Sequence, residues 1–139
     1  MSEIVDIEAL VATYLRDAGF RARATQPDKE HRVDSWVEVM LVSAPSDDQI
    51  PVDYFIGFLV QFSCYAGATG GQPEANRLVH DVRAALDLLP KVSFDDAVVT
   101  SVKFLTMPRI PDTAMEPARE RYVLDARIHA HPSVDGGSS

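Results

Sequence analysis

An apolar run in the middle of the sequence limits the possible folds more than any other feature. It extends from Tyr54 to Tyr65, begins shortly after Pro51, and consists mainly of aromatic and β-branched residues. A short run of this composition predicts a β-strand that is covered on both faces. We therefore expect this strand to lie in the middle of a sheet.

After this run, the sequence changes from the period of a strand to the period of a helix. Pro73 suits the first position of a helix, and Glu74 suits the positive end of the helix dipole. A buried strand followed by an amphipathic helix predicts a helix that packs across the sheet. The apolar residues from Pro73 onward fall on one stripe of that helix: Ala75, Leu78, Val79, Val82, Ala85, Leu86 and Leu89.

The first helix is predicted over residues 6–18, where apolar residues again form one stripe. Asp6 is placed to cap its start, and Gly19 is placed to end it in the left-handed conformation. Period-two or apolar segments predict the remaining strands, at residues 20–24, 35–43, 97–107 and 121–131.

The last two strands are expected to form a hairpin whose tip is the proline-rich stretch 108–119. Strict alternation in the first of them would put Val98 on one face and Val99 on the other. The second strand alternates most regularly, which is typical of a strand with one face on a core and one face in solvent or against a partner.

Together these elements predict an α+β fold. The expected order is α-β-β-β-α-β-β, with a mostly antiparallel sheet of four to five strands and two helices packed on one face. Residues 1–132 are expected to form a single domain, and residues 133–139 a flexible C-terminal tail.

The composition excludes several classes of protein. The 139 residues are 46% hydrophobic and 24% charged, which is typical of a soluble globular domain, and their formal net charge is −8. An acidic surface is unsuited to phosphate backbones and to anionic membranes, so we expect no sequence-specific nucleic-acid binding and no membrane association. The single cysteine excludes an intramolecular disulfide and a Cys-rich zinc site.

The sequence also predicts neither a secretory signal nor a transmembrane helix. The first residues, from Met1 to Asp6, are acidic and lack a basic segment. The longest apolar run is interrupted by Gly57 and Gln61 and is too short to cross a bilayer as a helix.

Two features between the central strand and the second helix are weak candidates for chemistry. The Gly-rich turn at residues 67–71 occupies the place of a phosphate-binding loop but lacks both phosphate-binding glycine patterns, so an ordinary connection is favoured. Cys64 could act as a nucleophile, but its position in the most apolar strand favours a small buried side chain.

Two polar groups elsewhere are also better explained as solvated surface residues than as metal ligands or acid–base groups. His129 and His131 share one face of the last strand, yet no third metal ligand is indicated. The adjacent aspartates at 47–48 and 95–96 are typical of solvated loops. We therefore expect no catalytic residues, no cofactor and no metal.

The proline-rich stretch is the better candidate for a functional surface, because a long irregular loop in a small domain is often functional. Exposed Ile110 and Met115 would suit a protein contact. The loop at residues 44–51 is a second candidate. The predicted contact residues are Asp47, Asp48, Arg109, Ile110, Asp112, Met115, Glu116 and Arg119.

Three segments resemble the tail terminator proteins of long-tailed (siphovirus-type) bacteriophages, especially those of actinobacterial phages. They are the opening IEALVATYL at residues 7–15, the piece VDYF at 52–55, and the ending RERYVLDARI at 119–128 that closes on His131 and Pro132. The resemblance spans residues 5–132. One departure is SWVE at residues 35–38, where members of the family often carry Pro-Phe before the second strand.

The resemblance implies a virion structural protein and not an enzyme. Members of the family form a hexameric ring on the last ring of the tail tube, stop tube polymerisation and present a docking surface to the head-side connector. The implied partners are further copies of this chain, the major tail tube protein and the connector or neck proteins. The implied location is the tail or neck of the virion, and the host cytoplasm during assembly.

Two alternatives to a tail terminator remain open. The chain could be another neck or tail-completion protein that joins head and tail. It could instead be a small-molecule-binding α+β domain with a pocket at the Gly-rich turn.

For the tail terminator itself, an acidic lumen in a ring of this chain would let DNA pass without binding it.

Overall fold

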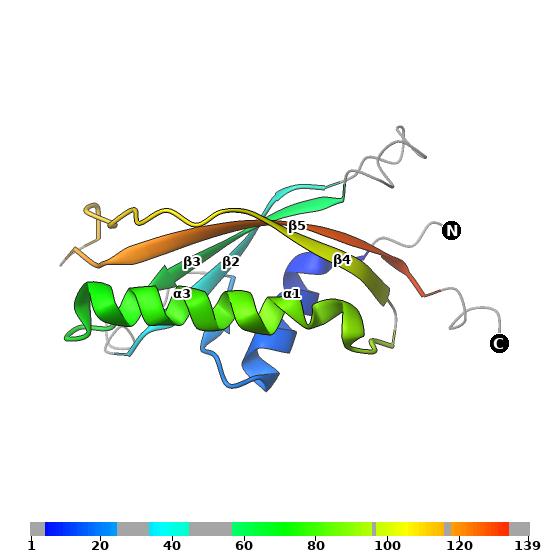
Figure 1. Ribbon diagram of the computed structural model, residues 1–139, viewed down its shortest axis with the longest axis horizontal. Helices are drawn as coiled ribbons and strands as arrows, with labels where there is room; N and C mark the ends of the chain where they lie inside the picture. The colour runs from blue at the N-terminus through cyan, green and yellow to red at the C-terminus, as the bar shows by residue number, and fades with distance from the viewer. Residues whose placement is uncertain (1–4, 25–33, 45–56, 96, 116–117, 134–139) are drawn as a thin grey trace.

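The computed structural model describes residues 5–24, 34–44, 57–95, 97–115 and 118–133 of the chain (Figure 1). The helices and strands follow the order that the sequence predicts. They are α1 (Ile7–Asp17), β1 (Ala22–Arg23), β2 (Trp36–Ser43), β3 (Phe58–Tyr65), α3 (Gly71–Asp87), the 3-10 helix η3 (Leu89–Lys91), β4 (Ala97–Thr106) and β5 (Arg121–Pro132).

The strands form one five-stranded sheet in the order β1-β2-β3-β5-β4. The short β1 runs parallel to β2, and the other neighbours are antiparallel. Helices α1 and α3 both lie on one face of this sheet, below it in Figure 1. The prediction of an α+β fold is confirmed, and β3 is the central strand as expected.

The central strand has its two faces covered to different degrees. Val60 and Phe62 point toward the helices and are fully buried. On the other face, which we call the open face, Leu59 and Gln61 are half-buried, and burial is complete only toward Tyr65. The expected cover on both faces is therefore present at one end of β3. Residues 54–56 of the predicted strand lie outside the described residues.

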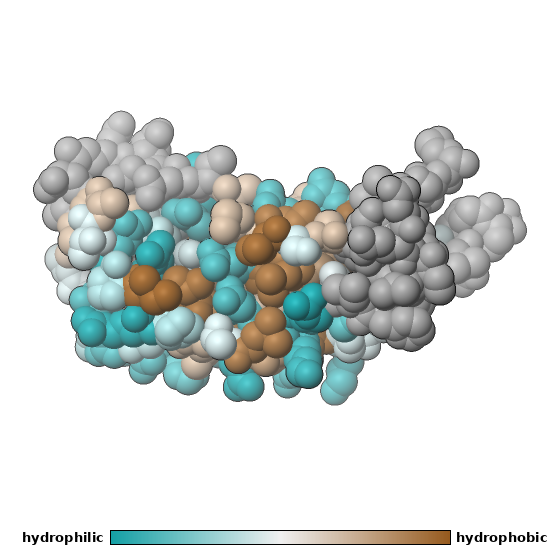
Figure 2. All heavy atoms as spheres, turned by 90° about the horizontal axis from the view of Figure 1, so that it is seen from above, coloured by the Kyte–Doolittle hydropathy of each residue, from teal (hydrophilic) through white to brown (hydrophobic). Residues whose placement is uncertain are grey.

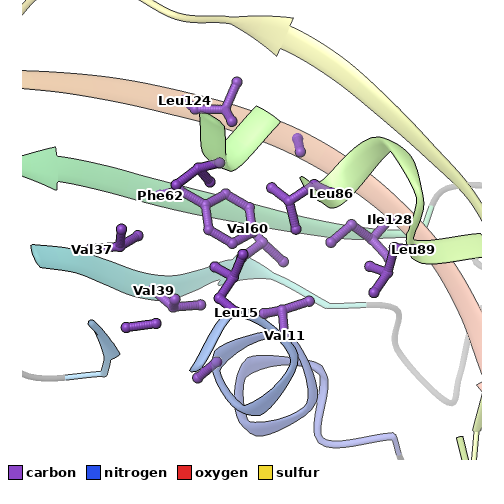
Figure 3. Close-up of a cluster of buried hydrophobic side chains, with 14 of the residues drawn as sticks. Val11, Leu15, Val37, Val39, Val60, Phe62, Leu86, Leu89, Leu124 and Ile128 are labelled. Carbon is purple, nitrogen blue, oxygen red and sulfur yellow. The ribbon is translucent and has the colours of Figure 1, made fainter. Parts of the chain in front are cut away.

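The main core fills the space between the sheet and the two helices (Figure 3). It is almost entirely aliphatic, so its stability comes from apolar burial and close packing. Helix α3 contributes the predicted stripe, although it begins at Gly71, so Pro73 is its third residue and not its first. The residues labelled in Figure 3 are Val11, Leu15, Val37, Val39, Val60, Phe62, Leu86, Leu89, Leu124 and Ile128.

Local polar contacts fix the position of α1. The side chain of Asp6 accepts a hydrogen bond from the backbone N–H of Ala9 at 3.1 Å, which is the predicted N-terminal cap. Gly19 follows the helix with a φ of +102°, the left-handed conformation that was expected there. The Glu8 carboxylate also accepts the backbone N–H of Leu41 at 2.8 Å, which gives one backbone donor of β2 a partner.

The last two strands pair as the predicted hairpin, but β4 is less regular than its sequence indicates. Its register against β5 shifts between Val99 and Ser101 and again between Phe104 and Thr106. The first shift places Val99 in the core and leaves Val98 exposed. It also puts Val99 on the same face as Val102, so the strict alternation expected from the sequence is wrong at this point.

Two leucines near the end of α3 test the contribution of the core. Leu86 is 0% exposed and Leu88 is 52% exposed. We expect Leu86→Ala to lower the free energy of unfolding by about 2–5 kcal/mol, because the substitution leaves a cavity among aliphatic side chains. The control Leu88→Ala should change it by less than about 0.5 kcal/mol in the same urea titration. Equal losses in the two variants would contradict this description of the core.

Candidate functional site

The candidate contact residues that the structure describes lie on an extension of the β4–β5 hairpin, the hairpin arm, which we define as residues 107–115 and 118–120. Arg109, Ile110, Asp112, Met115 and Arg119 all belong to it. Asp47, Asp48 and Glu116 lie outside the described residues. In Figure 1 the first part of the arm is the yellow trace at the left, which runs alongside the orange start of β5.

The hairpin arm is a paired ribbon and not the irregular loop that its prolines suggested. The backbone N–H of Ile110 donates to the carbonyl of Arg121 at 2.8 Å, and Asp112 and Arg119 exchange two backbone hydrogen bonds at 2.9 and 3.1 Å. Pro111 lies between the two donors Ile110 and Asp112. Its missing N–H therefore leaves no gap in the ladder, which explains how a proline fits in a paired strand.

Met115 is buried, so the expectation that it is exposed is wrong. It is 6% exposed and packs in a second apolar cluster with Trp36 and Tyr65. These two aromatic residues are register partners on β2 and β3, and their rings stack with centroids 4.5 Å apart. Since their neighbours Val37 and Cys64 point toward the helices, the cluster lies on the open face. Met115 thus covers aromatic surface that no described helix reaches.

Polar contacts join the hairpin arm to the same aromatic pair. The Tyr65 hydroxyl donates to Asp112 Oδ2 at 3.0 Å, and Arg121 Nη1 donates to the Tyr65 hydroxyl at 3.2 Å. Arg121 also donates through Nε to the carbonyl of Ile110 at 2.8 Å and lies over the Tyr65 ring. Asp112 therefore holds the arm in place, and its contact with a partner stays a prediction.

The environment of Tyr65 changes its ionisation. Burial, with the nearby charge of Glu38 and the hydrogen bond to Asp112, raises the pKa of Tyr65 from its ordinary value near 10 to about 12. The phenol is therefore neutral at physiological pH and remains a hydrogen-bond donor to Asp112.

Two features of the hairpin arm remain available to a partner. Ile110 is 43% exposed, as predicted from the sequence. Arg109 donates to both carboxylate oxygens of Glu120, at 2.8 and 3.0 Å, and this ion pair is itself partly exposed. Glu120 was not among the predicted contact residues. The arm thus presents an exposed apolar side chain and a fixed pair of opposite charges, and strand alternation directs Ile110 and its neighbour Arg109 to opposite faces of the ribbon.

The open face of the sheet adds exposed apolar residues that the sequence reasoning missed. Met40 on β2 is 49% exposed, and Val98 on β4 is 41% exposed. Figure 2, which views the molecule from above the sheet of Figure 1, shows apolar patches among polar ones on this face. Apolar residues at alternate positions of the second strand were the available signal, because β-strand alternation places Met40 on the same face as Trp36.

The polar side chains of the open face are tied to one another. Asp125 accepts from Gln61 at 3.3 Å and from the Thr106 hydroxyl at 3.2 Å. His129 Nδ1 lies 3.1 Å from the Ser101 hydroxyl. Within the described residues, no group of three or more His, Cys, Asp or Glu side chains is arranged to hold a metal ion.

The other two candidates for chemistry have structural roles. Cys64 is fully buried, and this burial raises the pKa of its thiol, which keeps it protonated and unreactive. In the Gly-rich turn, the backbone N–H of Gly67 donates to Glu74 Oε1. A carboxylate of the chain itself therefore occupies the position where a phosphate-binding loop would hold an anion.

The comparisons with known proteins found no match: no protein-family model matches the chain, and no curated protein does.

None of the helices in the described part of the chain is both long enough and apolar enough to span a membrane.

The link between Tyr65 and the hairpin arm can be tested by substitution. We expect Tyr65→Phe to lower the free energy of unfolding by about 1–2 kcal/mol at pH 7, because Asp112 and Arg121 lose a buried partner. A pKa raised on folding stabilises the fold below pH 10, and this contribution is lost as the pH rises from about 10 to 12. The stability of the unsubstituted protein should therefore fall faster than that of the variant over this interval.

Urea unfolding from pH 7 to 12 measures this difference, and the tyrosinate absorbance gives an independent check. The unsubstituted protein should contain a late-titrating phenol that Tyr65→Phe lacks. A difference in stability that stays constant with pH would show that folding does not raise the pKa of Tyr65, and equal stability of the two proteins would show that Tyr65 contributes by packing alone.

Proposed function

We propose that this protein is a structural component of a phage virion, a tail terminator that forms a ring on the end of the tail tube. The resemblance of residues 7–15, 52–55 and 119–128 to that family supports this function. The last of these segments includes Arg119 and Glu120 of the hairpin arm and the first part of β5. The proposed ring stops tube polymerisation and provides the docking surface for the head-side connector.

The observation that carries the proposal is the anchored hairpin arm. A contact element that is already ordered pays little conformational entropy when it binds. The buried cluster of Trp36, Tyr65 and Met115 holds the arm, and the exposed Ile110 is left for a neighbour. These are the properties that a repeated contact within a ring or with a tail tube requires.

A ring also requires two different contact surfaces on each copy. The arm offers one, and the open face of the sheet with Met40 and Val98 offers another. A contact between the arm of one copy and the open face of the next would be heterologous, and heterologous contacts close into a ring when the rotation is suitable. We propose six copies per ring, with the major tail tube protein and the connector or neck proteins as further partners.

The two alternatives differ in how the structure bears on them. Glu74 takes the backbone donor at the Gly-rich turn, which disfavours a small-molecule site there. A different neck or tail-completion protein could use the same arm, and only its binding partner would distinguish it.

Light scattering of the purified protein, alone and mixed with the matching tail tubes, tests the proposal. We expect either a hexamer in solution or a monomer that forms a ring only on the tube end. Ile110→Asp should weaken assembly or tube binding by at least about tenfold, because it places a charge in an apolar contact. Leu88→Asp is the matched control, since Leu88 is exposed on the helical side of the molecule.

The outcomes separate the possible functions. A monomer that ignores tail tubes would refute the tail terminator, and binding to connector rings alone would indicate another neck protein. If Ile110→Asp and Leu88→Asp had equal effects, the hairpin arm would not be the contact surface.

A further inference from the structure

A groove with a volume of about 910 Å³ lies on the helical side of the molecule. One wall is α1 with the residues next to its two ends, from Val5 to Ala18, and the other is formed by residues 92–95 and Ala97, which follow η3. The groove is separate from the hairpin arm, because none of its lining residues belongs to the arm.

The floor of the groove is apolar and fixed. Tyr14 and Phe94 meet edge to face, with ring centroids 6.4 Å apart, and Leu10 and Pro132 extend the apolar surface. The Tyr14 hydroxyl donates to the carbonyl of Ala85 at 2.6 Å and is therefore already used within the fold. A small polar ligand would find few groups to orient it here, whereas apolar side chains would find a preformed surface.

The charges at the groove have a single sign. Every charged residue among the described residues that line it is acidic, namely Asp6, Asp17 and Asp95. Asp6 caps the N-terminus of α1, and Asp17 lies at the other end of the helix. Acidic groups therefore border the groove at both ends of α1, while the centre of the groove is apolar.

We propose that this groove binds an amphipathic helix of a partner protein, with apolar residues on one face and Lys or Arg at its flanks. Apolar residues at i, i+3, i+4 and i+7 would lie on Leu10, Tyr14 and Phe94. The basic flanks would meet Asp17 and Asp95. A second copy of this chain is a poorer occupant, because it carries the same net charge of −8.

A synthetic helical peptide with Leu at i, i+3, i+4 and i+7 and Lys at the flanking positions is the probe. Fluorescence anisotropy with the full chain should detect binding that weakens as salt is added. The double variant Asp17→Asn/Asp95→Asn should weaken binding by about five- to tenfold, because it removes both exposed charges that meet the flanks. The single variant Thr13→Arg, which adds a positive charge at an exposed lining position, should weaken peptide binding more than the double variant does.

One control variant distinguishes the groove from the overall acidity of the chain, and one control peptide tests the need for basic flanks. Asp81→Asn/Asp87→Asn makes the same change in net charge on exposed positions of α3 outside the groove, and it should leave binding unchanged. A peptide with Glu in place of Lys should not bind.

Three results would overturn the proposal. The first is no binding of the Lys peptide. The second is an equal loss of binding in the two double variants, which would show that net charge alone attracts the peptide. The groove variants could instead change the mass of the protein in light scattering without any peptide binding, which would assign the groove to a second copy. The first two results leave the test of the tail terminator unchanged, because that test uses the hairpin arm, whereas the third would place a contact between copies in the groove.

Discussion

The pairing of β3 with β2 on one edge and β5 on the other is the constraint on which the rest of the structure depends. With both edges hydrogen-bonded, β3 can present its side chains only to the two faces of the sheet. Val60 and Phe62 face one layer, so the apolar stripes of α1 and α3 must both pack there. The aliphatic core and the one-sided arrangement of helices follow from that register.

The same register leaves a large aromatic pair on the face without helices. Trp36 and Tyr65 are directly opposite each other on β2 and β3, and leaving both in water would be costly. The hairpin arm shields this pair from water, because Met115 packs against both rings and Asp112 accepts a hydrogen bond from the Tyr65 hydroxyl. A requirement of packing thus also fixes the direction in which Ile110 is presented.

The two proposed contact surfaces differ in their electrostatics. On the hairpin arm, Arg109 is paired with Glu120, so the arm offers an apolar contact with locally balanced charge. The groove beside α1 has aspartates at both ends and no opposite charge among its described lining residues. A partner of the arm is therefore selected by shape and apolar contact, and a partner of the groove by its basic flanks.

By itself, the sequence determined the helices, the strands, their order and the α+β class, because the periods of 3.6 and two residues are local properties of the chain. It also indicated that Ile110 is exposed. Only the tertiary structure decided that Met115 is buried, that Val99 and not Val98 faces the core, and that a groove lies beside α1. These features depend on strand register, on bulges and on contacts between distant residues, such as the hydrogen bond from Tyr65 to Asp112, 47 positions apart. No local pattern records such contacts, because the period of a segment fixes its own faces but not what packs against them.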